Sequence, residues 1–243
     1  MCDQLRFDYL SCYGHPKLNT PNIDSLAARG VRFDNAYCQA PLCGPSRASF
    51  YTGRYISSHG VMANEDATRL DELTIGDYLR PSGYRSALVG KAGNRKDSEM
   101  LSAFGIDPDS EYARAAANGG FEPFDVHEGL LPRARQTDYT AYLNRHGYAG
   151  DNPWRDYVVT CADKSGNLRS GWHMRNAVYP ALVAEEHSET TYSTRRAIDF
   201  LEQQDADRPW CLHLSYIKPH WPYIAPAPYH DLYSAEDVQP VVR

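Results

Sequence analysis

Cys43, Pro45 and Arg47 lie within five residues of one another in the segment 41–54, PLCGPSRASFYTGR. A cysteine can act as a nucleophile, and the planar guanidinium of an arginine suits the oxygens of a sulfate or phosphate group. Pro45 fits the first turn of a helix, where its missing N–H loses no hydrogen bond. Cys43 is then expected just ahead of a helix N-terminus, where free N–H groups and the helix dipole favour an anion. The segment therefore predicts a site that takes an anionic ester and carries its own nucleophile.

The same segment matches a longer pattern, which weighs against the ordinary alternative that a lone cysteine is a core residue. Cys-x-Pro-Ser-Arg followed by Thr-Gly-Arg resembles the signature of the sulfatase family, and residues 20–37, TPNIDSLAARGVRFDNAY, resemble the family's approach to that signature. The resemblance implies that a formylglycine-generating enzyme oxidises Cys43 to formylglycine, whose hydrated aldehyde attacks the sulfur or phosphorus of an ester. A protein-tyrosine-phosphatase loop is the nearest chemical rival, but it separates its cysteine and arginine by more residues.

The first residues of the chain extend the resemblance to a metal site. Asp3 and Gln4 resemble the Asp-Gln pair of the phosphonate monoester hydrolase and choline-sulfatase branch of the family. This match implies that Asp3 and the modified Cys43 bind one divalent metal ion, calcium or manganese, whereas Asp3 alone would be taken as an exposed loop residue. Gln4 and Asn64 are expected to contact the substrate, with a plain turn role as the alternative for Asn64.

Two further residues match positions of the family's active site. Lys91 follows a predicted strand, as does the family lysine that contacts the nucleophile and the ester oxygens. An ordinary lysine at that position would be solvated. His220 lies between two prolines in KPHWPY at 218–223, which suits a positioned acid or donor, and it matches the family's second histidine. Many members carry another histidine two residues after the lysine, where this chain has Gly93, so that group is absent or is supplied by a neighbour.

The predicted secondary structure brings these residues to one place. A buried strand at 85–90 leads into Lys91, and a second buried strand at 209–217 leads to His220. Because ligands bind at the carboxyl edge of an open α/β sheet, both side chains should meet Asp3 there. A helix is predicted at 21–29, capped by Thr20 and with Ile23, Leu26 and Ala27 on an apolar face, and another at 73–79. A third helix is predicted at 188–204, with an apolar side formed by Tyr192, Ala197, Ile198 and Leu201. The remaining predictions are a loop at 56–60, a short strand at 31–33, a core position with satisfied hydrogen bonds for His213 and a solvated Lys218.

Residues 95–179 are irregular and rich in glycine, aspartate, asparagine and proline, with scattered aromatic residues. A structureless loop of this length is uncommon inside a compact domain. The segment therefore predicts an inserted cap with a short helix at 138–145 and an aromatic core of its own. The whole of 1–243 is expected to be the N-terminal part of a sulfatase catalytic domain, incomplete at both ends.

Composition narrows the classes of partner. The 243 residues carry a formal charge of −6, which argues against nucleic-acid binding, because that needs a basic face. Six cysteines without paired metal spacing indicate reduced thiols in a cytoplasm rather than a disulfide framework. The sequence shows no signal peptide and no apolar run long enough to cross a membrane. The expected partners are a small anionic ester, the formylglycine-generating enzyme and, in a homo-oligomer, further copies of the chain.

The resemblance implies a hydrolase of sulfate esters, or of similar phosphonate or phosphate esters, with the α/β fold of the alkaline-phosphatase-like superfamily and a mostly parallel sheet between helices. Cys43 would be the nucleophile, Arg47 and Lys91 would neutralise developing charge, and His220 would assist the substrate or leaving oxygen. Two alternatives stay open. One is a phosphatase that uses an unmodified Cys43 thiolate and no metal. The other is an inactive relative or fragment that binds an anion or a partner, which the residue Gly93 favours.

Overall fold

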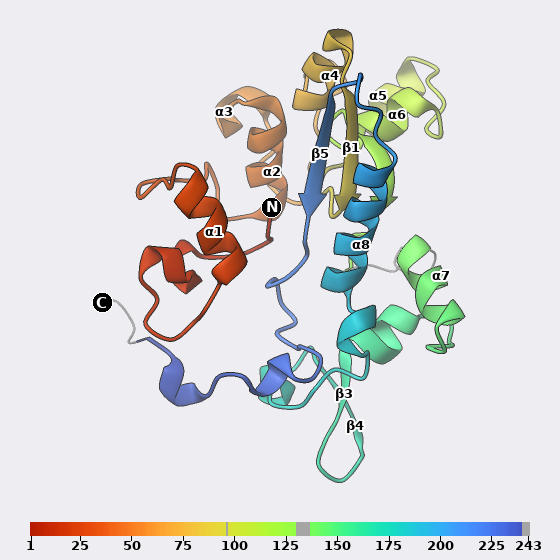
Figure 1. Cartoon of the computed structure of the whole chain (residues 1–243). Helices are drawn as coiled ribbons and strands as arrows, with labels where there is room; N and C mark the ends of the chain where they lie inside the picture. The colour runs from red at the N-terminus through yellow and green to blue at the C-terminus, as the bar shows by residue number, and fades with distance from the viewer. Residues whose placement is uncertain (96, 130–136, 240–243) are drawn as a thin grey trace.

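The computed structural model describes residues 1–95, 97–129 and 137–239 (Figure 1). Its centre is a three-stranded parallel sheet in the order β2-β1-β5, formed by β1 (Arg85–Gly90), β2 (Glu122–Val126) and β5 (Trp210–Ser215). All but the first residue of β1 are buried, as expected for the middle strand of a covered parallel sheet. The first residues of the chain run parallel to the end of β5, where the Asp3 N–H donates to the Tyr216 carbonyl at 3.0 Å.

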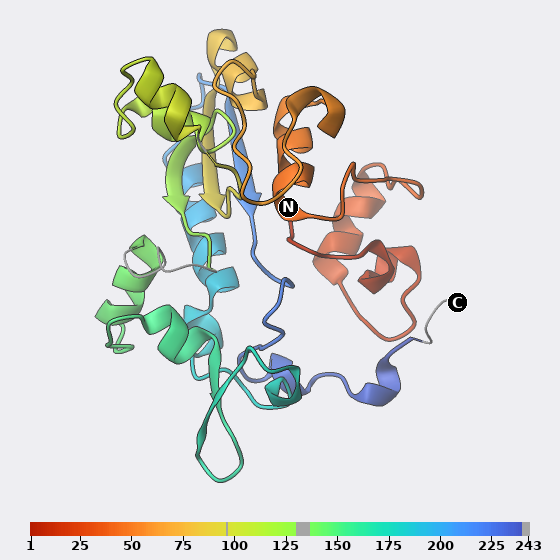
Figure 2. The same ribbon diagram turned by 180° about the vertical axis from the view of Figure 1, so that it is seen from behind.

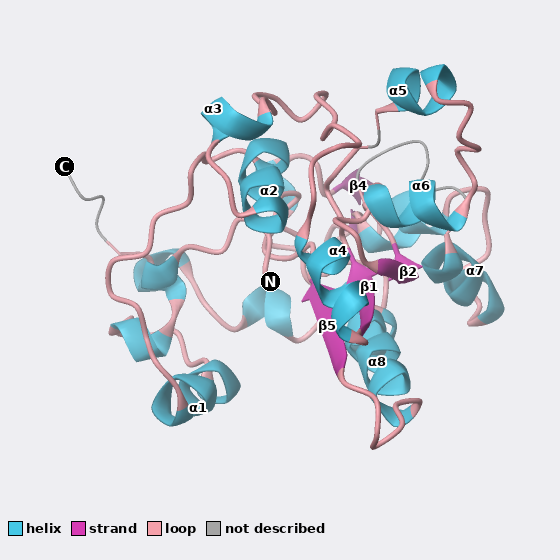
Figure 3. Ribbon diagram, turned by 90° about the horizontal axis from the view of Figure 1, so that it is seen from above, coloured by secondary structure: helices cyan, strands magenta, loops and turns pink. Residues whose placement is uncertain are grey.

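Helices cover both faces of the sheet, as the turned views show (Figures 2 and 3). Helix α8 (Glu189–Glu202) packs on one face and contacts all three strands. Helices α2 (Cys43–Thr52) and α4 (Ile75–Leu79) lie on the other face, where Tyr51, Leu88 and Phe121 share a core cluster. This arrangement confirms the predicted α/β class with a parallel sheet between helices.

The remaining elements are short. They are α1 (Pro21–Arg29), α3 (Ile56–His59), α5 (Ser98–Ala103), α6 (Glu111–Ala116), α7 (Asp138–Arg145), a π-helical turn (Trp154–Val158), the hairpin of β3 (Thr160–Ala162) and β4 (Leu168–Ser170), and 3-10 turns at Phe7–Tyr9, Ser11–Tyr13, Arg80–Ser82, Met174–Asn176, Glu185–His187, Tyr229–Asp231 and Ala235–Asp237. None of the helices in the described ranges is both long and apolar enough to span a bilayer.

The predicted strand at 31–33 is wrong. This stretch has no regular structure, and Val31 and Phe33 are 77% and 67% exposed. The alternating apolar side chains therefore do not pack on a buried face, which a strand of this pattern would need. The predicted apolar face of α1 is also wrong, because Leu26 is 63% exposed. Thr20 precedes α1 as predicted, but its hydroxyl bonds with Ser11 and Asp24 rather than accepting from a helix N–H.

Several predicted boundaries agree with the structure. The strand at 85–90 and the helix at 138–145 match β1 and α7, and the predicted strand at 209–217 contains β5. Helix α8 falls within the predicted range of 188–204, and the Ser188 hydroxyl accepts from the Thr191 N–H as a cap should. Three details differ. The predicted helix at 73–79 begins only at Ile75, and the predicted loop at 56–60 contains α3. On the predicted apolar side of α8, Tyr192 and Ala197 are buried as predicted, whereas Ile198 and Leu201 are exposed and Phe200 is buried in their place.

The segment 95–179 is not irregular throughout. It contains β2, an edge strand of the central sheet, and Phe121 belongs to the core cluster beneath that sheet. Later residues of the segment do form an aromatic core of their own, which α8 and Ile224 also join. Its buried members are Tyr139, Leu143, Trp154, Val158, Val159, Cys161, Ala181, Val183, Tyr192 and Ile224. The role of this segment as a substrate cap stays a prediction.

Candidate active site

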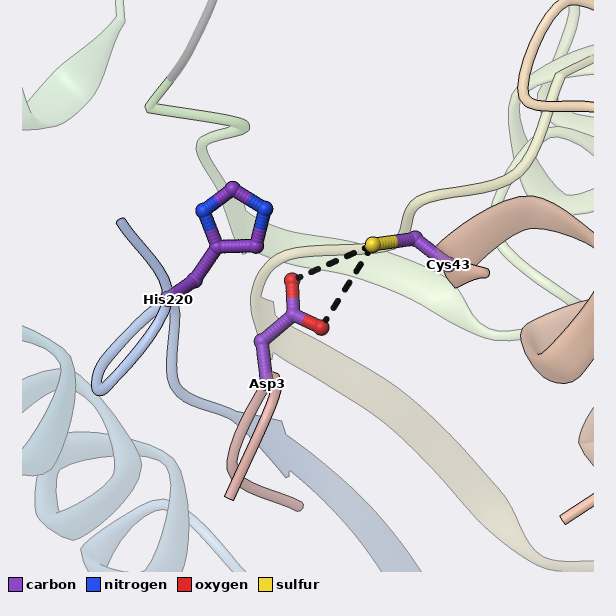
Figure 4. A group of neighbouring side chains, drawn as sticks. All are labelled: Asp3, Cys43 and His220. Atoms are coloured by element: carbon purple, nitrogen blue, oxygen red, sulfur yellow. Dashed lines mark hydrogen bonds between the residues drawn. The ribbon is translucent and has the colours of Figure 1, made fainter. Parts of the chain in front are cut away.

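Three side chains from distant parts of the chain converge at the carboxyl edge of the sheet (Figure 4). Asp3, Cys43 and His220 each offer one potential ligand atom, and these atoms all lie within 4.8 Å of one another. Asp3 stands just beyond its pairing with Tyr216, Cys43 is the first residue of α2, and His220 follows β5. The Cys43 Sγ lies 3.7 and 3.9 Å from the two Asp3 carboxylate oxygens.

The charge of Asp3 is compensated by two buried cations. The Lys91 Nζ lies 2.5 Å from the Asp3 Oδ2, and the Arg47 Nη2 lies 3.8 Å from the same oxygen. Burial opposes ionisation of Asp3, but the hydrogen bond and charge of Lys91, with the charges of Arg47 and His220, outweigh it and lower the pKa of Asp3. Asp3 is therefore an anion in a site that is otherwise positive.

Arg47 is a buried arginine that is 3% exposed. Its Nη1 donates to the Lys91 carbonyl at 2.8 Å, to the Ala92 carbonyl at 3.2 Å and to the Ser215 hydroxyl at 3.0 Å. Its buried Nη2 has no hydrogen-bond partner among the described residues. Arg47 thus ties α2 to the ends of β1 and β5, and it retains one donor group for an anion.

The two residues predicted to contact substrate have partners within the chain. Gln4 is exposed, adopts a left-handed backbone with φ of 64°, and donates from Nε2 to the Tyr223 hydroxyl at 2.9 Å. The Asn64 Oδ1 accepts from the backbone N–H of Gly44 at 2.7 Å, directly after Cys43. Gln4 therefore lies beside the site, whereas Asn64 supports the helix end that carries Cys43. Contact of either residue with substrate stays a prediction.

His220 lies in a loop that is fixed by contacts at both sides. Its Nδ1 is 2.5 Å from the Trp221 carbonyl. Lys218, predicted to be solvated, instead donates from Nζ to the Pro222 carbonyl at 2.7 Å, and burial lowers the pKa of Lys218 despite the nearby charge of Glu189. The prediction for Lys218 was wrong because sequence gives no sign that the loop folds back on itself.

His213 lies in the core, as predicted, but the prediction that its hydrogen bonds are satisfied there is wrong. The ring lies among Phe50, Tyr51 and Phe121, with centroid separations of 5.2, 5.7 and 5.6 Å. The His213 Nε2 is buried and has no hydrogen-bond partner in the described part of the chain. Burial lowers the pKa of His213 to about 4, with smaller contributions from the chain terminus and Arg47.

Glu128 was not identified from the sequence. Its Oε1 accepts from the backbone N–H groups of Ala92 and Gly93, at 3.1 and 2.9 Å. This carboxylate fixes the turn directly after Lys91. Glu128 follows β2, and because that strand was not predicted, the sequence offered no reason to place it at the sheet edge.

The three converging donors fit part of a divalent metal site. They combine a carboxylate oxygen, an imidazole nitrogen and the side chain of residue 43, which would supply oxygen after oxidation. Carboxylate oxygens suit calcium and manganese, and imidazole suits transition metals. No second group of three such side chains converges within residues 1–95, 97–129 and 137–239. The sequence predicted Asp3 and residue 43 as ligands, and the structure adds His220 as a candidate.

Comparison with known proteins identifies the family to which the chain belongs. The family model described as "Sulfatase" matches residues 1–239, and the chain belongs to this family. The multifunctional alkaline phosphatase superfamily protein PehA of Trinickia caryophylli is 32% identical over 237 residues, covering 94% of this chain and 41% of that protein. An arylsulfatase of Clostridium perfringens is 30% identical over 246 residues, covering 98% of this chain and 46% of that protein.

Among solved structures, the phosphonate monoester hydrolase of Agrobacterium radiobacter superposes with a TM-score of 0.78 at 25% identity. The match covers 98% of this chain and 44% of that chain. The fold of the chain is thus that of the phosphonate monoester hydrolases and sulfatases. The chain spans less than half the length of these relatives.

Proposed function

We propose that the protein carrying this chain hydrolyses sulfate esters or similar phosphonate or phosphate esters. The observation that supports this best is the convergence of Cys43, Asp3 and His220 beside Lys91, in a chain of the sulfatase family. A nucleophile, a carboxylate, an imidazole and an ammonium group gathered at one edge of the sheet can together transfer a tetrahedral anion.

Each residue has a role in this proposal. Lys91 and the unpartnered Nη2 of Arg47 neutralise charge that develops on the ester oxygens. His220 moves a proton to or from the substrate or leaving oxygen. When residue 43 carries formylglycine, its hydrated aldehyde supplies the oxygen that attacks sulfur or phosphorus. Gln4 and Asn64 would contact the ester in this proposal.

Asp3 and residue 43 would hold a divalent ion, calcium or manganese, which would supply charge to align and activate the nucleophile. The Lys91 ammonium already bonds to the Asp3 Oδ2, so the freer oxygen for a metal is Oδ1. We also propose that formylglycine-generating enzyme modifies Cys43 and that the protein works in a reducing cytoplasm. All six cysteines are free, which supports this location.

The proposal is tested by modification and turnover together. The protein is produced with and without formylglycine-generating enzyme, and the peptide containing residue 43 is weighed by mass spectrometry. Hydrolysis of an aryl sulfate and an aryl phosphonate monoester is then measured with added manganese or calcium, beside a Cys43→Ala variant. Aldehyde formation and turnover that both vanish in Cys43→Ala are expected. Modified protein that hydrolyses neither ester would contradict the proposal.

A thiolate-dependent phosphatase is the second candidate, and the structure offers one observation on it. The sulfur of Cys43 faces the Asp3 carboxylate, whereas a thiolate nucleophile is stabilised by a neighbouring cation. Activity of unmodified protein that resists chelator and is abolished by thiol alkylation would favour this candidate. An inactive anion-binding relative would instead bind sulfate or a partner without turnover in either form.

A further inference from the structure

We propose that Trp172 is a positioning residue for His220, and that a row of three tryptophans, Trp154, Trp172 and Trp221, fixes which ring nitrogen of His220 faces the site. The Nδ1 of His220 is 2.5 Å from the Trp221 carbonyl oxygen. A carbonyl oxygen can only accept a hydrogen bond, so Nδ1 must carry the proton in this contact.

This contact sets the chemistry of the other nitrogen. With Nδ1 protonated, a neutral His220 has its lone pair at Nε2, which is the ring nitrogen left for the group that contains Asp3 and Cys43. In Figure 4 the ring nitrogen farther from the main chain lies on the side of Cys43. His220 in its neutral form is therefore a base or a ligand through Nε2, and only its imidazolium form donates a proton there.

The carbonyl that fixes this tautomer is held from the side by aromatic packing. The Trp221 ring packs edge to face on Trp172, with centroids 4.3 Å apart and an interplanar angle of 71°. Trp172 in turn packs on Trp154 at 6.2 Å. Edge-to-face aromatic pairs stabilise packing beyond the burial of apolar area alone. A shift of Trp172 would thus release the peptide unit that orients His220.

The far end of the row is anchored in the core. Trp154 is 6% exposed, and its Nε1–H donates to the Glu189 Oε1 at 2.7 Å. Glu189 is 4% exposed and is the first residue of α8, the helix that covers one face of the sheet. Trp154 and Trp172 lie within 95–179. This segment therefore contacts the loop that carries His220, through the packing of Trp172 on Trp221.

A second contact closes the same loop from the other side. The Lys218 Nζ donates to the Pro222 carbonyl at 2.7 Å, which links the residues on either side of His220. Pro219 and Pro222 restrict the backbone angles of the loop. The lysine contact and the tryptophan row both stabilise the loop arrangement in which the Trp221 carbonyl meets Nδ1.

The test measures the tautomer directly and does not depend on turnover. ¹⁵N NMR of the metal-free protein, at a pH where the ring is neutral, distinguishes protonated from unprotonated ring nitrogens, and a His220→Gln variant assigns the signals. The wild-type protein is expected to show a protonated Nδ1 and an unprotonated Nε2. Trp172→Ala is expected to give mixed tautomers, whereas Trp172→Phe keeps the aromatic contact and should retain the wild-type pattern.

Trp210→Ala is the matched control, because Trp210 begins β5 at the opposite end of the strand from His220 and packs on Phe200 at 6.3 Å. It should leave the tautomer unchanged. Retention of the wild-type tautomer in Trp172→Ala, or its loss in folded Trp210→Ala, would overturn the proposal.

The inference rests on the proposed function only for its kinetic readout. In modified, active protein, Trp172→Ala should lower kcat about ten- to a hundredfold with little change in KM, and Trp172→Phe should restore it. Altered tautomers in a protein that never turns over would support Trp172 as a positioning residue while contradicting the proposed hydrolase. An altered tautomer with unchanged kcat in active protein would contradict the positioning role in catalysis.

Discussion

Gly93 stands where many sulfatases carry a histidine, and its surroundings explain why a side chain does not fit. Its φ is +57°, and a Cβ built on it would lie 2.4 Å from the Arg47 Cδ. We expect Gly93→Ala to lower the free energy of unfolding by about 2–4 kcal/mol, since it adds left-handed strain to overpacking against a buried arginine. Gly93→His should be destabilised at least as much and should gain no activity, because the new side chain would displace Arg47.

Gly53→Ala provides the control for this prediction. Gly53 ends α2 with φ of +67°, and a Cβ there meets nothing within 4 Å. Gly53→Ala should lower the free energy of unfolding by only about 1 kcal/mol, because it introduces backbone strain without a steric clash. Thermal and denaturant unfolding of both variants measures the difference. Equal decreases in the free energy of unfolding for the two variants would show that Arg47 moves aside freely, and would contradict the prediction.

His213 predicts a pH dependence of stability. Its pKa falls from 6.5 to about 4 on burial, so the native protein holds a neutral ring while the unfolded chain binds a proton below about pH 6.5. Stability should therefore decline as the pH falls from 6.5 towards 4, by up to about 3 kcal/mol from this residue. His213→Phe keeps the contacts with Phe50 and Phe121 and should remove this part of the decline. Denaturant midpoints measured at several pH values test it, and parallel curves for the two proteins would contradict it.

Helix α2 depends on a residue outside itself for its N-terminal cap. Leu42 occupies the cap position and has no side-chain acceptor, while the Asn64 Oδ1 accepts from the Gly44 N–H at 2.7 Å. We expect Asn64→Ala to lower the free energy of unfolding by about 1 kcal/mol and to loosen Cys43, because a helix-end donor loses its partner. Asn64→Asp retains the acceptor and should restore stability. Denaturant unfolding of both variants separates this role from a substrate contact, since a residue that only contacts substrate would change neither midpoint.

Prediction from sequence succeeded for elements whose local pattern agrees with their surroundings. The apolar run of β1 lies in the middle of a covered sheet, and the pattern of α7 matches its buried side chains Tyr139 and Leu143. It failed where tertiary packing decides. β2, with sequence EPFDV, contains a proline and forms an edge strand, so neither composition nor alternation marks it. The alternation at 31–33 suggested a strand, but nothing packs on it.

The candidate site divides in the same way. Cys43 was predicted from its spacing to Pro45 and Arg47, whereas Asp3, Lys91 and His220 were predicted mainly from their match to positions of the sulfatase family. The structure brings Cys43, Asp3, Lys91 and His220 together. Glu128 and Trp172 could not be predicted. Each makes a contact between segments far apart in the sequence, and the residues around each one form no local pattern that predicts such a contact.

Burial is divided unevenly over the whole molecule. The elements between residues 7 and 29, two 3-10 turns and α1, contain no buried residue. In contrast, Ala87, Leu88 and Val89 of β1 are fully buried and bonded to strands on both sides. Regions with few buried contacts open locally at a free energy far below that of global unfolding. Residues 7–29 should therefore be the least stable part of the described chain, although they directly follow the Asp3 segment that belongs to the site.

Native-state hydrogen exchange tests this expectation. Amides of α1 should exchange at least about a hundredfold faster, relative to their intrinsic rates, than those of β1 and β5. The amide of Asp3 is the internal control, because it bonds to the Tyr216 carbonyl beside β5 and should exchange as slowly as the sheet. A sharp rise in exchange between Asp3 and Phe7 would show that the metal-ligand candidate belongs to the core while the turns after it open independently. Equal protection in α1 and β1 would instead mean that the segment folds and unfolds with the sheet, and that its exposed apolar residues are covered in solution.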